Sequence, residues 1–224
     1  MQPELFKESH IMNRSNKLNF AATDFKIYLM DRLDQEKCAE TIANMFSMID
    51  SQPIHPIYNQ NYKMVSPYDL PENNPVALDI FINSGGGVFE VLGQISSLFG
   101  LAKSKGIIIR TFVPNYAGSS ASMLAIQGTP GYRIMGEYAQ HFVHFGSTTN
   151  KVALESEIDK AYKDMKNHAK ASEQIYLSNT NISKTRLKEL RMDEYGYISA
   201  QECLKNGFCD WILTNNGQFL SKNR

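Results

Sequence analysis

Apolar residues in this chain fall into short runs that alternate with longer segments of helical periodicity. The runs at 25–29, 76–83 and 107–113 are rich in Ile, Val, Leu and Phe and are typical of buried strands. At 34–50 and 88–105, apolar residues recur every three or four positions, which predicts amphipathic helices. Strands that alternate with helices predict an α/β fold with a largely parallel sheet.

The same patterns continue toward the C-terminus. A helix of small residues is expected at 119–128. Short strands are expected at 132–136, 140–146 and 210–213, and further helices at about 152–177, 183–192 and 200–207. The helix from about Val152 to Leu177 is the longest and has a heavily charged face.

Two segments depart from this alternation. Residues 1–24 are polar and irregular, and we expect a flexible N-terminal arm there. Residues 51–75 carry five prolines among polar residues. Because the flanking elements resemble one βαβ unit, we expect this segment to be an excursion within a single domain that covers residues 25–224.

Composition narrows the classes of protein. The chain has 224 residues with 23 basic and 23 acidic side chains, so its formal charge is zero, which argues against a protein that coats nucleic acid. Cys38, Cys203 and Cys209 form no C-x-x-C pair, so we expect buried, reduced thiols and no zinc ribbon or other metal site. Without an apolar leader or a run of ~20 apolar residues, a cytoplasmic protein with no membrane partner is expected.

Three glycines follow the strand at 76–83. The dinucleotide motif G-x-G-x-x-G is incomplete because its third glycine would fall at Glu90, and no acidic residue occurs between Glu90 and Glu137. Glycines at a strand end can form a tight turn, or can expose backbone N–H groups to an extended peptide or to an oxyanion.

A second segment, Gly118-Ser119-Ser120-Ala121-Ser122-Met123, lies where a strand is expected to meet a helix. It departs from the G-x-S-x-G nucleophile elbow, because Ser122 stands where the second glycine should be. Serines in such a turn act either as helix caps or as an exposed nucleophile.

His141 and His144 are the candidate bases for a serine mechanism. Residues three apart in a strand point to opposite faces, so at most one of the two imidazoles faces a common site. A histidine in an apolar strand can equally be structural. The remaining histidine downstream of the serines, His168, lies in the middle of a predicted helix.

The order of these motifs resembles the proteolytic subunit of Clp protease, a serine peptidase of the ClpP/crotonase fold, over about Phe25 to Leu213. The matching segments are Asn83-Ser84-Gly85-Gly86-Gly87-Val88, Ala121-Ser122-Met123, Val143-His144 and Tyr197-Ile198-Ser199-Ala200-Gln201-Glu202. Gly85 replaces the family's proline, and the segment between Met123 and Arg133 is short. The resemblance implies repeated βαβ units with a protruding helical handle.

The resemblance also implies roles for individual residues. Ser122 would be the nucleophile and His144 the general base, with the backbone N–H groups of Gly87 and Met123 as oxyanion donors. Gly85, Gly86 and Val88 would bind an extended substrate by strand addition.

The third member of the triad is ambiguous. Counting back from Tyr197-Ile198-Ser199-Ala200 places the family's aspartate at Tyr195, whereas counting forward from His144 places it at Asp193. We expect Asp193 to complete the triad, with Glu194 as the alternative. Both can instead be ordinary surface acids.

The resemblance implies a self-compartmentalising endopeptidase that needs no cofactor. Its partners would be copies of itself in a heptameric ring or a stacked pair of rings, a peptide or unfolded protein, and an AAA+ ATPase unfoldase. Two other interpretations remain: a catalytically impaired assembly or regulatory subunit, suggested by Tyr195, and an acyl-CoA enzyme of the crotonase type, which also uses paired backbone N–H groups.

Overall fold

The computed structural model describes most of the chain and contains two sheets. The residues it describes are 20–23, 25–57, 59, 62–74, 76–144, 155–192 and 196–222. The expectation of an N-terminal arm falls on residues 1–19 and 24, which lie outside this part. Residues Phe20–Thr23, also expected in that arm, form a strand.

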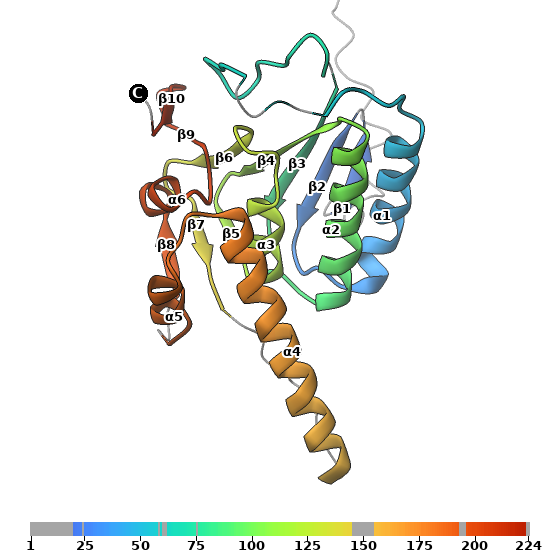
Figure 1. Ribbon diagram of the computed structural model, residues 1–224, viewed down its shortest axis with the longest axis vertical. Coiled ribbons are helices and arrows are strands. Elements are labelled where there is room, and N and C mark those ends of the chain that lie inside the picture. The colour runs from blue at the N-terminus through green and yellow to red at the C-terminus, as the bar shows by residue number, and fades with distance from the viewer. Residues whose placement is uncertain are drawn as a thin grey trace, which may run out of the picture.

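The larger sheet has seven strands in the order β1-β2-β3-β4-β6-β9-β10 (Figure 1). Their bounds are β1 (Phe20–Thr23), β2 (Lys26–Met30), β3 (Ala77–Asn83), β4 (Ile108–Val113), β6 (Arg133–Gly136), β9 (Trp211–Leu213) and β10 (Phe219–Ser221). The five central strands pair in parallel and the two edge strands pair antiparallel. This mixed sheet agrees with the predicted α/β class.

The smaller sheet has three strands, β5 (Tyr116–Gly118), β7 (Gln140–Phe142) and β8 (Tyr197–Ser199). Strand β5 pairs in parallel with β7, and β7 pairs antiparallel with β8. Ala117, His141 and Ile198 are register partners and are all buried, so they form the inner face of this sheet. The candidate active site lies at this sheet.

The helices pack mainly through apolar stripes that the sequence predicts. Their bounds are α1 (Gln35–Asp50), α2 (Phe89–Ser104), α3 (Ser120–Ile126), α4 (Glu155–Asn179), α5 (Lys184–Met192) and α6 (Ala200–Asn206). Asp34 caps α1 and Ser199 caps α6. In each case the side chain accepts a hydrogen bond from the backbone N–H of the residue three positions later. Helices α1 and α2 lie side by side against the larger sheet, whereas the lower part of α4 extends beyond the rest of the molecule (Figure 1).

The proline-rich segment is anchored at several points although it has neither helix nor strand in its described part. The Asn74 side chain donates to the carbonyls of Pro56 and Gly106. Arg110 donates to the Pro67 carbonyl and lies 4.7 Å from the centre of the Tyr68 ring. The segment therefore has a defined path above the strands (Figure 1).

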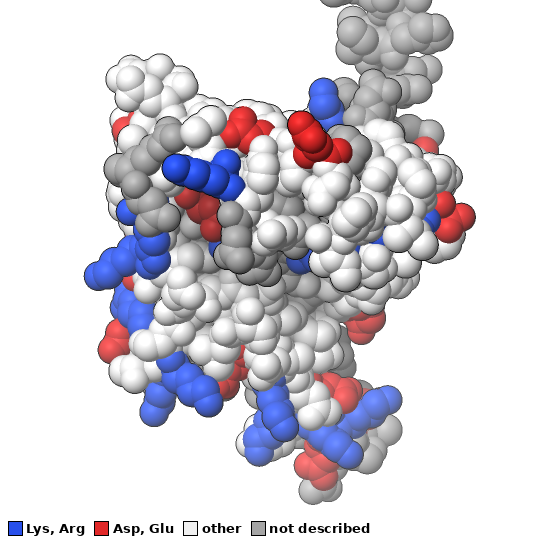
Figure 2. All heavy atoms as spheres, turned by 45° about the horizontal axis from the view of Figure 1, so that its top comes forward, with Lys and Arg blue, Asp and Glu red and all other residues white. Residues whose placement is uncertain are grey.

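Charged side chains of both signs are intermixed on the protruding end of the molecule, and the face above it is largely uncharged (Figure 2). The three cysteines are free and buried, as expected. No helix in the described ranges is long and apolar enough to cross a membrane.

Candidate active site

Ser122 lies inside the protein, in the first turn of α3. Its side chain is fully buried, with 0% exposure. The Oγ atom is 2.8 Å from Nδ1 of His141 and accepts a hydrogen bond from the Tyr176 hydroxyl at 3.1 Å. A peptide carbonyl has no access to this oxygen in the structure.

His141 forms the other half of this buried pair. Burial, with a smaller contribution from the charge of Arg133, lowers its pKa from 6.5 to about 3, so the imidazole is neutral at pH 7. Its Nε2 atom is also buried and has no hydrogen-bond partner among the residues that the structure describes. No carboxylate in that part of the chain orients this ring, as a triad requires.

His144, the predicted base, lies past the end of β7. Its imidazole stacks on the Phe142 ring at a centroid distance of 5.1 Å and is half-buried. Burial lowers its pKa from 6.5, which favours the neutral form that can accept a proton. Its ring makes no hydrogen bond with Ser122, whose partner is His141. The structure therefore does not bring together the two residues that the resemblance paired, and both roles stay predictions.

Ser119 is a second candidate for the nucleophile, which the family resemblance does not indicate. It is the residue before α3, with φ 52° and ψ −125°, a conformation that non-glycine residues rarely adopt. Its side chain is half-buried and makes no capping hydrogen bond, unlike the enclosed Ser122. Its backbone N–H donates to the Phe142 carbonyl at 2.9 Å, two residues before His144.

Nucleophilic serines of α/β-hydrolases are held on a strained turn of this kind, between a strand and a helix. Strand β5 ends at Gly118 and α3 begins at Ser120, so the strained residue is the turn itself. The family resemblance leaves a short segment between Ser122 and Arg133. If Ser119 takes the place of Ser122, that segment is three residues longer. Two sequence signals point to Ser119: its place directly after Gly118, at the expected junction of a strand and a helix, and this spacing to Arg133.

The predicted oxyanion donors are occupied. The Met123 N–H donates to the Ser119 carbonyl at 3.1 Å within the helix. The Gly87 N–H donates to Ser120 Oγ at 3.2 Å, and the same hydroxyl donates to the Gly87 carbonyl at 2.7 Å. The N–H of Ser120, which follows Ser119, has no acceptor within the described ranges. In α/β-hydrolases the N–H of the residue after the nucleophile is one of the oxyanion donors.

The glycine loop, Gly85-Gly86-Gly87, is packed tightly against its neighbours. Leu33 pairs with it through two backbone hydrogen bonds, to the Gly86 carbonyl at 2.9 Å and from the Val88 N–H at 2.8 Å. A Cβ atom on Gly87 would lie 1.9 Å from the Leu33 carbonyl oxygen. The edge expected to bind a substrate at Gly86 and Val88 is therefore used within the chain, and only Gly85 is exposed.

Asp193, Glu194 and Tyr195 lie outside the described residues, so their predicted roles are not tested. The chain resumes at Gly196, whose carbonyl accepts a hydrogen bond from the Val143 N–H at 2.8 Å. Val143 precedes His144 directly, so the chain that follows Asp193, Glu194 and Tyr195 runs beside the candidate base.

No group of three or more His, Cys, Asp or Glu side chains that could hold a metal occurs in the part of the chain described. The candidate residues at this sheet are Ser119 in a strained backbone conformation, His144 just past the end of β7, and the loop Gly85-Gly86-Gly87.

The two sheets, the glycine loop and the serine turn define an α/β protein of the ClpP/crotonase fold. Residues 70–216 match the model of the Clp protease family, and the chain belongs to that family. It is 28% identical over 152 residues to the ATP-dependent Clp protease proteolytic subunit of Streptococcus thermophilus, covering 65% of this chain and 72% of the relative. The corresponding subunit of Lactococcus lactis subsp. lactis is 26% identical over 148 residues, covering 65% and 71%.

Proposed function

We propose that this chain is a serine endopeptidase that cleaves peptides or unfolded polypeptides, with Ser119 rather than Ser122 as the nucleophile. The observation that carries the proposal is the backbone of Ser119, whose φ of 52° holds a half-buried, uncapped serine at the turn between β5 and α3. Family membership supports the reaction class.

In this mechanism His144 takes the proton from Ser119 Oγ as the oxygen attacks the peptide carbonyl carbon. The carbonyl becomes an oxyanion, toward which the Ser120 N–H donates. His144 then gives the proton to the leaving amine, and water, activated by the same imidazole, hydrolyses the ester on Ser119. Asp193 is the proposed carboxylate that orients His144. A second oxyanion donor, from Gly87, requires the Ser120 side chain to rotate away.

The test is covalent labelling with a fluorophosphonate, followed by mass spectrometry of the labelled peptide. We expect the wild-type chain to be labelled at Ser119, and Ser119→Ala to lose both labelling and peptidase activity. Ser97→Ala, which removes an exposed hydroxyl on α2, is the matched control and should behave like the wild type. Labelling at Ser122 would instead contradict Ser119 and support Ser122 as the nucleophile.

A second function, that of a catalytically impaired assembly or regulatory subunit, is favoured by one observation. The hydroxyl of Ser120 occupies the Gly87 N–H that an oxyanion would need. Under this alternative, no serine of the assembled protein is labelled, and peptides remain intact.

Assembly belongs to the same proposal. The relatives are named as proteolytic subunits of an ATP-dependent protease. We infer that this chain also forms a ring, heptameric or doubled, that receives unfolded protein from an ATPase partner. Co-sedimentation of the intact protein with such an ATPase tests this part independently of labelling.

A further inference from the structure

Under the candidate site lies a fully buried hydrogen-bond network that the proposed mechanism does not use. It consists of Ser122, His141 and Tyr176, each with 1% exposure or less. The Tyr176 hydroxyl donates to Ser122 Oγ, and Ser122 Oγ lies 2.8 Å from His141 Nδ1. A hydrogen-bonded polar network inside an apolar core restricts its members to one arrangement.

The three residues come from three different elements. Ser122 belongs to α3, three residues after Ser119, and His141 belongs to β7, three residues before His144. Tyr176 belongs to the end of α4 that packs on the body of the molecule. The Ser122–His141 hydrogen bond therefore joins the helix that follows the candidate nucleophile to the strand that leads to the candidate base.

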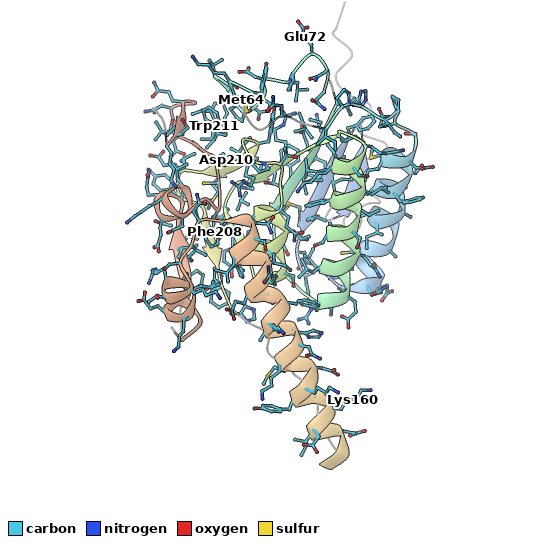
Figure 3. All side chains as sticks on the ribbon, viewed as in Figure 1. Met64, Glu72, Lys160, Phe208, Asp210 and Trp211 are labelled. Atoms are coloured by element: carbon cyan, nitrogen blue, oxygen red, sulfur yellow. The ribbon has the colours of Figure 1, made fainter. Side chains whose placement is uncertain are left out.

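Apolar packing supports this geometry from one side. Phe208 meets the His141 ring edge-on at 5.6 Å and the Tyr176 ring at 5.7 Å. Figure 3 shows Phe208 beside the upper end of α4. Because Phe208 closes this side of the network, a rearranged Tyr176 or His141 would have to displace a buried ring.

We propose that Ser122, His141 and Tyr176 are positioning residues that hold Ser119 and His144 in register for catalysis. This inference rests on the proposed function. None of the three residues touches the substrate. Ser122 acts by fixing the first turn of α3 against β7, and Tyr176 acts by fixing Ser122 from α4.

The test compares Ser122→Ala and Tyr176→Phe with the wild type. Ser122→Ala removes both hydrogen bonds of the network, whereas Tyr176→Phe removes one and leaves the Ser122–His141 bond. Because small displacements of reacting groups cost up to ~100-fold, we expect Ser122→Ala to lower kcat and the labelling rate of Ser119 by about 10- to 100-fold. KM should stay within about twofold, since substrate contacts are unchanged.

Two controls separate positioning from general damage. Ser172→Ala removes another buried hydroxyl of α4 that lies outside the network, and should leave kcat unchanged. The double variant Ser122→Ala/Tyr176→Phe should be no slower than Ser122→Ala alone, because the contribution of Tyr176 acts through Ser122. Additive losses in kcat would contradict this coupling.

The outcomes distinguish this inference from the proposed function. If Ser122→Ala is labelled at Ser119 and turns over at the wild-type rate, the network has no positioning role. If Ser122→Ala fails to fold, Tyr176→Phe decides by the same readouts.

If no serine of the wild type is labelled, the peptidase proposal fails. A crystal structure of Ser122→Ala then decides: a broken Ser119–Phe142 backbone hydrogen bond supports the positioning role, and an unchanged 2.9 Å separation overturns it.

Discussion

At the scale of single residues, His141 couples the buried network to solution pH. Its pKa is about 3 in the folded protein and near 6.5 when exposed, with burial as the main cause. Between these two values the unfolded chain binds one more proton than the folded chain. The free energy of unfolding therefore rises with pH across this window. The stability that neutral His141 contributes is complete above about pH 6.5 and is lost as the pH falls from there toward 3.

We predict that lowering the pH from 7 to 5 costs about 2 kcal/mol of stability through His141 alone, at about 1.4 kcal/mol per pH unit below 6.5. Urea unfolding at both values measures the change. His141→Gln should show a smaller dependence on pH than the wild type, and His168→Gln, on the half-buried face of α4, serves as control. Equal slopes in wild type and His141→Gln would show that His141 does not titrate in this window.

At the scale of elements, one ion pair joins β6 to the residue before β9, and its arginine also bonds the end of α4. Arg133 donates to both carboxylate oxygens of Asp210, at 2.9 and 2.7 Å, and also to the Asn179 carbonyl at 2.7 Å. Asp210 in turn accepts from the backbone N–H groups of Gly131 and Arg133. The Arg133 side chain is only 9% exposed, so its charge depends on Asp210 for compensation.

Asp210→Asn should lower the free energy of unfolding by about 3 kcal/mol, because it leaves a buried guanidinium without its counter-charge. Asp159→Asn removes an exposed carboxylate from α4 and should change stability by less than about 0.5 kcal/mol. Denaturant unfolding of the two variants makes the comparison. A loss for Asp210→Asn no larger than that of the control would mean that Arg133 is adequately solvated through its carbonyl partners.

At the scale of the whole molecule, the protruding half of α4 carries apolar side chains that the described part of the chain leaves exposed. Ile158 and Tyr162, one helical turn apart, are 55% and 54% exposed. Lys160 lies on this same protruding part (Figure 3). Exposed apolar side chains at this spacing on an otherwise charged helix are typical of a contact surface, and we expect a second copy of the chain to cover it.

We predict that native mass spectrometry of the wild type gives masses that are multiples of 25.4 kDa. Ile158→Asp combined with Tyr162→Asp should shift the population toward smaller assemblies, because a charge would be buried in the contact. Lys160→Ala, a change on the same helix turn, is the control. Wild-type protein seen only as a monomer would contradict self-association.

Regular elements of the fold were predictable because their signals are long. The apolar spacing of α1 and α2 and the runs of β3 and β4 extend over six residues or more, and the structure has these elements close to the expected bounds. The strands β5 and β8 were missed because their three residues, Tyr116–Gly118 and Tyr197–Ser199, lack the continuous apolar run that marks the equally short β9. Strand β10 is equally short, and its pairing with β9 depends on a turn at Gly217.

The sequence by itself determined the α/β class, the order of motifs and the family, because these depend on residue types along the chain. Only the tertiary structure decided which serine and which histidine meet. Ser119 and Ser122 are two serines of the same segment. The backbone of Ser119, with φ 52°, holds its side chain half-buried on a turn, whereas Ser122, one helical turn later, is enclosed in the core. The strand that carries His141 turns that imidazole to the inner face and leaves His144 beyond its end. Backbone direction and burial, which arise only when distant elements pack, make this distinction.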